Sequence, residues 1–360
     1  MGVANPRLMV QADVAIIGAG PIGLELAVAF KQLGIRTIHL EAGQVGQTIS
    51  WFPKQVRFFS SPERIAIAGV PLQNVDQSKA TREEYLVYLH GICQQFDLPI
   101  NTYERVTDIT PNESGGLTIH SQHRDGKQCY RVKNAVLAIG DMHQPRLLNI
   151  PGENLPHVSH YFDEPHRYFR QRLLIVGGKN SAVEAALRCY RANARVTISY
   201  RRNEFDHSIK YWLRPELEVL IKTGQLTFQP KTVPIRITPQ HVTLRMLENG
   251  ECRDVDANFV LLLTGYEMDS SLFQTAGVEL RGPNRAPTVN EQTMQTNVSG
   301  LYVAGTAAAG TQAKFRLFLE NSHNHVQKIV RAITGRDPLF DASDKTNAAL
   351  TAQRKALPES

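Results

Sequence analysis

Cysteine is scarce in this chain, and its thiols are far apart. The 360 residues include four cysteines, Cys93, Cys129, Cys189 and Cys252, and no two of them form a C-x-x-C pair. This spacing matches neither a metal-ligand motif nor a redox-active dithiol. The pattern favours a reducing compartment, so we expect a cytoplasmic protein without a bound metal.

Long apolar runs and blocks of one charge are missing as well. Apolar stretches such as Phe259 to Leu263 are far shorter than the roughly 20 residues of a membrane helix. The first long apolar run already contains a glycine turn, which argues against a secretory signal. The net charge of +6 comes without a basic, aromatic-rich segment, so we expect no nucleic-acid partner and no membrane association.

The chain does contain two glycine-rich units of the dinucleotide-binding kind. The first reads DVAIIGAGPIGLELAVAFKQLGIRTIHLEAG, in which a buried strand, a glycine turn, a helix and a second strand follow one another. Gly18, Gly20 and Gly23 give the G-x-G-x-x-G spacing that lets a pyrophosphate approach the backbone at a helix N-terminus. Glu41 ends the second strand, where a carboxylate accepts ribose hydroxyls and repels a 2′-phosphate. This unit is predicted to hold FAD or NAD rather than NADP.

The second unit, RLLIVGGKNSAVEAALRCYRANARVTISYRR, begins near the middle of the chain. Gly177 and Gly178 make its turn, and its return strand ends in Arg201 and Arg202. Guanidinium groups bind phosphate in a bidentate manner, so these arginines favour NADPH, although two surface arginines can also follow a strand by chance. Lys179 stands where the motif usually has its second glycine. Its side chain either adds charge near the pyrophosphate or points to solvent, and the sequence leaves both alternatives open.

The segments between these units indicate a duplicated α/β fold. ATREEYLVYLHGICQQFDLPI has helical spacing, LTIHSQ and QCYRVKNAVLAIGD alternate like antiparallel strands, and ANFVLLLTGYEMD resembles the end of the second of these strands. TNVSGLYVAGTAAAG adds a strand that ends at Gly305, followed by a helix expected to begin near Phe315. We therefore predict two Rossmann-like domains, with the NADPH domain inserted into the FAD domain. The expected limits are 1–153 and 284–340 for FAD, 154–283 for NADPH, and 341–360 for a flexible tail.

Several longer motifs resemble the flavoprotein family that includes thioredoxin reductase, and more closely its bacillithiol-disulfide-reductase-like branch. They are FFSSPERIAIAGVP, YFDEPHRYF, VGGKNSAVEAAL, SIKYWLRPELE and GLYVAGTAAAGTQAKFRLFLENSHNHV, and together they extend over most of the chain. The resemblance implies an FAD- and NADPH-dependent oxidoreductase, in which hydride passes between nicotinamide and flavin at about 3–3.5 Å. It also implies a small-molecule electron acceptor, possibly a disulfide, and is compatible with a homo-oligomer.

The resemblance assigns expected cofactor contacts by position. For FAD these are Gly18, Gly20, Pro21, Ile22, Gly23, Glu41, Gly140, Gly305 and Thr306. For NADPH they are Gly177, Gly178, Lys179, Asn180, Ser181, Ala182, Arg201, Arg202, Lys210 and Tyr211. Glu320, Asn321 and His323 are further candidates for the acceptor site, beside Lys210 and Tyr211.

This chain departs from the wider family at three places. It has no C-x-x-C, it has Ile22 where the closer branch commonly carries a cysteine in G-P-C-G, and Thr306 replaces an acid that touches the flavin. Cys93 and Cys189 both lie in apolar helical sequence and are expected to be core residues rather than nucleophiles. No catalytic residue is therefore assigned, and a disulfide would have to be reduced without a thiol relay.

Two other functions remain open at this stage. A flavin-dependent monooxygenase is one, because PGENLPHVSHYF partly matches the linker of those enzymes through Gly152, His157 and Tyr161, with the spacing off by one residue. Packing of Tyr161 and Phe162 between domains explains the same segment. The other is a non-enzymatic redox sensor, whose flavin reports the NADPH level to a partner.

Overall fold

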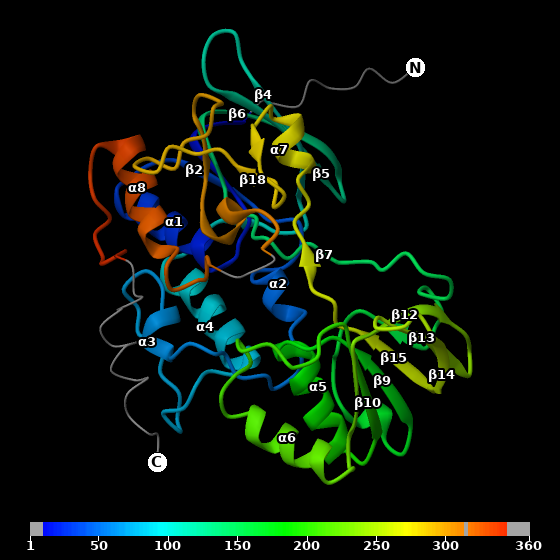
Figure 1. Cartoon of the computed structure of the whole chain (residues 1–360). Helices are drawn as coiled ribbons and strands as arrows, with labels where there is room; N and C mark the ends of the chain where they lie inside the picture. Colours follow the sequence, from blue (N-terminus) through cyan, green and yellow to red (C-terminus); the bar gives the residue numbers. More distant parts are fainter. Residues whose placement is uncertain (1–9, 313–315, 344–360) are drawn as a thin grey trace. The chain divides into compact units, whose positions relative to one another are not determined.

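The computed structural model describes residues 10–312 and 316–343, and the chain divides into two compact units (Figure 1). The first unit contains 1–50, 57–144 and 266–360, and the second contains 51–56 and 145–265. The second unit is thus inserted into the chain of the first, as the sequence predicts. Residues 344–360 of the expected tail lie outside the described residues.

The first unit is built on a seven-stranded sheet of order β3-β2-β1-β6-β5-β4, with β19 also paired to β6. Strands β1, β2, β3, β19 and β6 run parallel, and β5 and β4 continue the sheet antiparallel. The strands are β1 (Val10–Ile17), β2 (Thr37–Leu40), β3 (Ile100–Asn101), β4 (Arg105–Pro111), β5 (Leu117–His123), β6 (Gly126–Leu137) and β19 (Leu301–Val303). The helices are α1 (Pro21–Gln32), α2 (Gln47–Ser50), α3 (Pro62–Ile65), α4 (Arg82–Gln95), α7 (Ser271–Thr275), η2 (Gly305–Ala309) and α8 (His323–Thr334).

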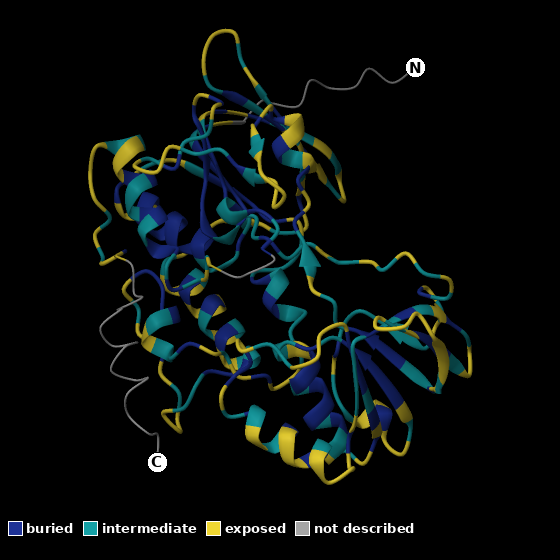
Figure 2. Cartoon of the chain, in the orientation of Figure 1, coloured by how far each residue is buried: buried dark blue, intermediate teal, exposed yellow. Residues whose placement is uncertain are grey.

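Alternation along β1 explains how both faces of this sheet are covered. Val14 and Ile16 pack in one core with α1 and α8, while Ala15 and Ile17 pack in another on the opposite face. Successive side chains of a strand point to opposite faces, so four consecutive apolar residues are what a strand buried on both sides requires. Figure 2 shows these central strands as buried along their length.

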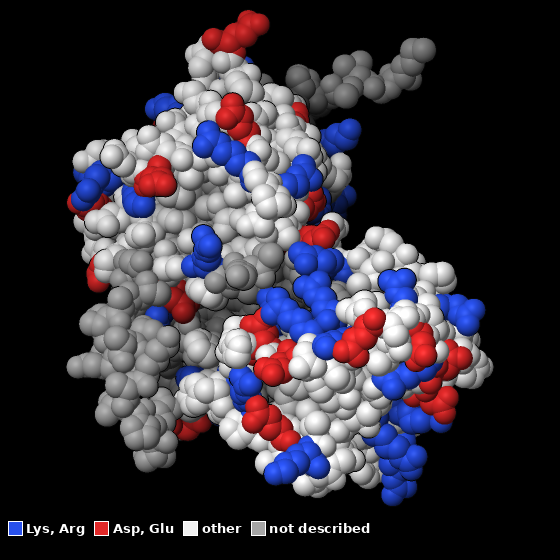
Figure 3. Space-filling view, viewed as in Figure 1, with Lys and Arg blue, Asp and Glu red and all other residues white. Residues whose placement is uncertain are grey.

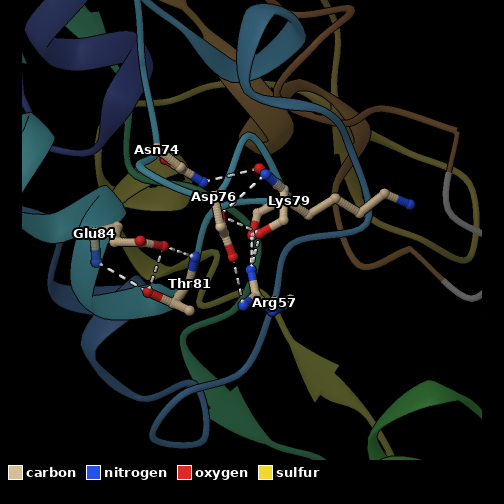
Figure 4. Close-up of polar contacts among 7 residues, drawn as sticks. Arg57, Asn74, Asp76, Lys79, Thr81 and Glu84 are labelled. Atoms are coloured by element: carbon tan, nitrogen blue, oxygen red, sulfur yellow. Dashed lines mark hydrogen bonds and ion pairs between the residues drawn. The ribbon is translucent and has the colours of Figure 1, made fainter.

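Helix α4 begins where the sequence places a capping box. The Thr81 hydroxyl accepts the Glu84 N–H, and the Glu84 carboxylate accepts the Thr81 N–H at 2.7 Å, so two free donors of the first turn are satisfied (Figure 4). Arg57 ties down the preceding loop by donating to the Lys79 carbonyl at 2.7 Å and to Asp76 at 3.2 Å.

The second unit has a parallel five-stranded sheet of order β11-β10-β9-β15-β8 and an antiparallel sheet of order β12-β13-β14. The parallel strands are β8 (Val158–Ser159), β9 (Arg172–Val176), β10 (Arg195–Tyr200), β11 (Thr227–Pro230) and β15 (Phe259–Leu262). The antiparallel ones are β12 (Thr232–Ile237), β13 (His241–Met246) and β14 (Cys252–Asp256). Helices α5 (Asn180–Arg191) and α6 (Arg214–Lys222) and the turn η1 (His166–Tyr168) complete the unit.

The chain passes between the units at β7 (Gln144–Pro145) and β16 (Tyr266–Glu267), which pair with each other. The second unit therefore ends near residue 265 rather than at the expected 283, because Phe273 and Val278 are buried in a core of the first unit. The hairpin of β17 (Leu280–Arg281) and β18 (Ala286–Pro287) also belongs to the first unit.

One predicted helix start was wrong. Phe315 itself lies outside the described residues, but residues 316–322 are not helical and α8 begins at His323. Gln312 explains part of this irregular path, because its side-chain carbonyl accepts the N–H groups of Arg316 and Leu317, both at 2.9 Å. An amide side chain that satisfies backbone donors in this way stabilises a loop in place of a helical turn.

Candidate functional site

The three glycines of the first loop meet three different demands. Gly18 has φ +104°, and a Cβ there would lie 2.5 Å from the carbonyl oxygen of Ala138 on the neighbouring strand. A Cβ on Gly23 would overlap the Gly18 carbonyl, so this glycine lets the helix pack against the turn. These are the steric roles that the sequence motif predicts for the first and third positions.

Gly20 differs from both, because its backbone would accept a side chain. It is the N-cap of α1 with φ −76°, and no heavy atom lies within 4 Å of a Cβ placed on it. The space that a side chain would fill is therefore open, beside the free N–H groups of a helix N-terminus. This arrangement fits the pyrophosphate of a dinucleotide, and Pro21 at the first helical position removes one donor that the helix cannot use.

Glu41 is buried next to this loop and holds it in place. One carboxylate oxygen accepts the N–H of Ala19 at 2.6 Å, and the other accepts the N–H of Gly43 at 2.7 Å. Each oxygen still has a second lone pair, so the carboxylate can also accept a ribose hydroxyl. The predicted ligand residue is thus also a structural link between the loop and the end of β2.

His39, which sequence reasoning missed, supports the same loop from below. Its Nε2 lies 3.0 Å from the carbonyl oxygen of Gly18, and its Nδ1 is buried without a hydrogen-bond partner. Burial lowers the pKa of His39 from 6.5 to about 4, so the ring is neutral at pH 7. A neutral ring that donates from Nε2 fixes the direction of the Gly18 carbonyl. A lone histidine within an apolar strand, in RTIHLE, was the available signal.

Four of the predicted FAD residues are brought together from three separate segments. A Cβ on Gly305 would lie 3.5 Å from the Ile22 side chain, and one on Gly140 would lie 4.0 Å from the Thr306 hydroxyl. Gly140 and Gly305 both have left-handed backbones, with φ +74° and +73°. The start of α1, the end of β6 and the end of β19 therefore converge at one edge of the sheet, where parallel α/β folds bind their ligands.

The three acceptor-site candidates near α8 are committed inside the first unit. His323 is fully buried, with Nδ1 2.7 Å from Glu25 and Nε2 3.2 Å from the Arg64 carbonyl. Glu320 is buried and accepts the Ser60 hydroxyl at 2.6 Å. Asn321 accepts the N–H of Phe318 at 2.7 Å and donates to the Arg316 carbonyl. The idea that His323 faces an acceptor was wrong, because both of its ring nitrogens already bind protein groups.

The second loop repeats the geometry of the first with other side chains. Gly177 has φ +148°, and a Cβ there would lie 2.6 Å from the Leu263 carbonyl oxygen, just as Gly18 meets Ala138. Ala182 replaces the third glycine and packs fully buried, 3.0 Å from the same Cβ position. Gly178 is needed for a different reason, because the Tyr200 ring fills the space of its missing side chain.

Lys179 is the N-cap of α5 with an extended backbone, φ −114°, which a side chain adopts without strain. Asn180 follows in the first turn, donates to the Ser208 carbonyl at 3.1 Å and accepts the Lys210 N–H at 2.6 Å. The SIKYW segment is thereby tied to the second loop, as the sequence comparison predicts. Lys210 itself is mostly buried and pairs with Glu184 at 2.9 Å, whereas Tyr211 is 53% exposed.

Arg201 and Arg202 are exposed directly after β10. Arg202 donates to Asp206 at 3.0 Å, and a hydrogen bond from the Ser208 hydroxyl lowers the pKa of Asp206 below its usual range. Across the second unit, acidic and basic side chains lie next to one another on the surface (Figure 3), as in the pairs Arg172–Asp256 and Arg191–Glu216.

None of the four cysteines has the environment of an activated thiol. Cys189 is fully buried in the core of the second unit, and burial raises its pKa to about 12. Burial raises the pKa of Cys93, on α4, to about 11. Cys129 lies on β6 and Cys252 on β14, and all four thiols are free. The predicted core role of Cys189 is confirmed, since thiolate formation at neutral pH is strongly disfavoured there.

The linker that partly matches monooxygenases has structural reasons for its residues. A Cβ on Gly152 would overlap the Ile237 carbonyl, and His157 Nε2 lies 3.1 Å from the carbonyl of Thr238. Tyr161 packs edge-on against Trp51 with ring centroids 6.0 Å apart, and Phe162 is buried in the core of the second unit. Packing of this kind accounts for the segment without a catalytic role.

Two classes of feature are absent from the described part of the chain. Across 10–312 and 316–343, no helix has the length and hydropathy needed to span a bilayer. The His, Cys, Asp and Glu side chains of the same ranges form no cluster that could hold a metal ion.

Comparisons with known proteins agree with this geometry. The pyridine nucleotide-disulphide oxidoreductase family model matches residues 15–305. Bacilliredoxin reductase Bdr of Bacillus subtilis is 35% identical over 91% of this chain and 99% of its own length. The structure of bacillithiol disulfide reductase Bdr (YpdA) of Staphylococcus aureus superposes with a TM-score of 0.85 at 32% identity, over 91% of this chain and 99% of that one. A ferredoxin–NADP reductase of Ignicoccus hospitalis is 25% identical, over 81% of this chain and 89% of its own.

The predicted fold class, enzyme class and cofactors are thus confirmed. FAD supplies a two-electron carrier between nicotinamide and acceptor when it is bound, while the chain supplies the loops, helix ends and buried polar groups that hold it. The chain belongs to the pyridine nucleotide-disulphide oxidoreductase family and is an FAD- and NADPH-dependent oxidoreductase.

Proposed function

We propose that this enzyme passes electrons from NADPH to a low-molecular-weight disulfide at the flavin, without a protein thiol as relay. The names of its relatives indicate the class of acceptor, since one names bacilliredoxin and another bacillithiol disulfide. FAD is proposed to bind at Gly18, Gly20, Gly23 and Glu41, with Ile22, Gly140, Gly305 and Thr306 beside it. NADPH is proposed to bind at Gly177 to Ala182, with Arg201 and Arg202 on its 2′-phosphate.

The observation that carries the proposal is the side chain of Ile22. It follows Gly20 and Pro21 in the first loop, is buried, and contacts the position of Gly305 at the converging edge of the sheet. A hydrocarbon at this place cannot form a mixed disulfide. Cys93 and Cys189 do not replace it, because their thiols are held protonated by burial.

The stoichiometry needs no thiol in the protein. One NADPH provides a hydride, which carries two electrons, and two electrons cleave one S–S bond. With one proton from solvent, NADPH and a disulfide give NADP⁺ and two thiols. The protein's part is to bind and align the partners and to keep the reduced flavin from other acceptors.

The second unit provides the reason to expect NADPH rather than NADH. Two exposed guanidinium groups follow the return strand of its loop, at the place where the first unit has Ala42 and Gly43. A carboxylate in this region would repel a 2′-phosphate, whereas an arginine pair attracts it.

We test the proposal by the fate of the reduced flavin. Purified protein is bleached with NADPH without oxygen, and return of the absorbance near 450 nm is followed after adding bacillithiol disulfide, glutathione disulfide or cystine. Reoxidation by at least one of them, with two thiols formed per NADPH, supports the proposal. Reoxidation by oxygen alone, with a substrate hydroxylated, indicates a monooxygenase. Bleaching that neither disulfides nor oxygen plus substrate reverse indicates a redox sensor.

The cellular setting is part of the same proposal. Four free thiols match the reducing cytoplasm expected from the sequence. Whether the enzyme is a homo-oligomer is tested by light scattering on the flavin-loaded protein.

A further inference from the structure

We propose that His325 is a positioning residue for the flavin site, which holds the turn after β19 by accepting the backbone N–H of Gly305. The sequence analysis singled out His323 of the same segment, but His325 is the histidine that contacts the converging edge. The inference depends on FAD binding by the first unit and does not depend on which acceptor the enzyme reduces.

The contact itself is specific. The Gly305 N–H donates to Nδ1 of His325 at 3.2 Å, and both residues are buried. The preceding N–H, of Ala304, still donates to the Leu137 carbonyl in the sheet at 2.9 Å. Gly305 is thus the first residue beyond the parallel ladder, and its amide is bound by a side chain instead of a strand. A buried amide of this kind needs a partner.

This bond sets the direction of the residues that follow. It fixes the plane of the peptide between Ala304 and Gly305, and Gly305 then turns with φ +73°, a conformation that favours glycine. Together these set where the amide and hydroxyl of Thr306 point, and the hydroxyl lies beside Gly140. Because Thr306 stands where an acid is usual, we infer that the backbone of this turn carries more of the flavin contact.

The base on which His325 stands is rigid. Two residues earlier on α8, His323 is bound to Glu25 of α1 at 2.7 Å, and the Glu25 carboxylate also accepts the Ala68 N–H at 3.2 Å. Val326 and Ile329 of α8 are fully buried against residues of α1. The start of α8 therefore links the phosphate-binding helix to the turn after β19.

The atom that matters is Nδ1, and this makes the proposal testable by isosteres. In asparagine the carbonyl oxygen Oδ1 occupies the place of Nδ1, whereas in glutamine the corresponding oxygen lies one bond further out. Leucine has a similar volume and no acceptor. His90, an exposed histidine on α4, serves as the control position.

The experiment measures FAD binding to the flavin-free protein by quenching of flavin fluorescence, together with the visible absorbance and circular dichroism of the bound flavin. For His325→Leu and His325→Gln we expect the Kd for FAD to rise about tenfold or more, with a shifted flavin spectrum. For His325→Asn we expect a Kd within about threefold of the unmutated protein and an unchanged spectrum, because an acceptor for the Gly305 N–H is restored. His90→Leu should change neither.

Two results would overturn the proposal. One is a His325→Leu protein that binds FAD with the original affinity and spectrum. The other is equal affinity of the Asn and Gln variants, which differ only in where the acceptor lies. If the Leu variant fails to fold, as judged by melting of the flavin-free protein, the Asn and Gln pair still decides. None of these readouts uses an electron acceptor, so failure of the disulfide hypothesis leaves them intact.

Discussion

The two dinucleotide loops share one backbone scheme and differ in what surrounds it. Gly18 donates to the Leu40 carbonyl at 2.8 Å, and Gly177 donates to the Ser199 carbonyl at 3.0 Å, so the two turns correspond residue by residue. On this correspondence Gly20 matches Lys179, Glu41 matches Tyr200, and His39 matches Ile198. The first loop is held by buried polar groups, and the second by an aromatic ring and by exposed charge.

The comparison shows that glycines in one motif serve different purposes. Gly178 makes room for the protein's own Tyr200 ring, whereas Gly20 leaves room that nothing in the described residues fills. Lys179 occupies the place of Gly20 with the same extended backbone, so the second loop tolerates a side chain where the first loop has none. Close approach of a ligand to the backbone is therefore expected at the first loop.

The largest expected effect comes from filling the space at Gly20. A Gly20→Val protein should fold, because φ −76° suits a side chain and no neighbour clashes, yet it should purify without FAD. Lys179→Val makes the same change in the second loop and should keep its flavin. The flavin-to-protein absorbance ratio measures both. A fully yellow Gly20→Val protein would show that the pyrophosphate does not lie there.

The second effect concerns the buried histidine that only the first loop has. Burial lowers the pKa of His39 to about 4, below its unfolded value, so its stabilising effect is complete above about pH 6.5 and is lost as the pH falls toward 4. The loss amounts to roughly 3 kcal/mol in the free energy of unfolding. Urea denaturation at several pH values should show a shallower decline for His39→Gln, which keeps an N–H donor. Equal slopes would contradict this account of the loop.

A third prediction concerns the charges that only the second loop has. Arg201→Ala should raise the KM for NADPH tenfold or more and leave that for NADH nearly unchanged, since a charge-assisted phosphate contact contributes about 1.5–3 kcal/mol. Arg172→Ala, also on the second unit but paired with Asp256, is the control. Equal use of NADPH and NADH by the unmutated enzyme would remove the basis for this prediction.

The smallest effect is expected at Lys179. If its ammonium group supports the pyrophosphate, Lys179→Ala should weaken NADPH and NADH alike by about two- to fivefold, the range of a partly exposed charge contact of about 0.3–1 kcal/mol. Lys179→Arg should retain most of the affinity. Unchanged KM values for both nucleotides in Lys179→Ala would show that the side chain points to solvent.

The sequence was sufficient for the repeated βαβ units, because apolar periodicity and glycine spacing are local properties. Strands such as Thr37–Leu40 and the helix at Arg82–Gln95 followed from that periodicity and from a capping box. The end of the second unit did not follow, because burial of Phe273 in a core of the first unit depends on contacts distant in sequence. For the same reason reasoning from SHNH chose His323, although His325 is the residue that reaches Gly305.

The most direct test of the central claim uses a protein without any cysteine. In a variant with Cys93, Cys129, Cys189 and Cys252 all replaced by serine, the flavin is reduced anaerobically with NADPH and then mixed with the disulfide that the unmutated enzyme accepts best. We predict that the flavin reoxidises at nearly the original rate with two thiols released, provided that flavin content and melting temperature are preserved. Loss of reoxidation in this correctly folded, fully reducible variant would contradict the account and reveal a catalytic thiol.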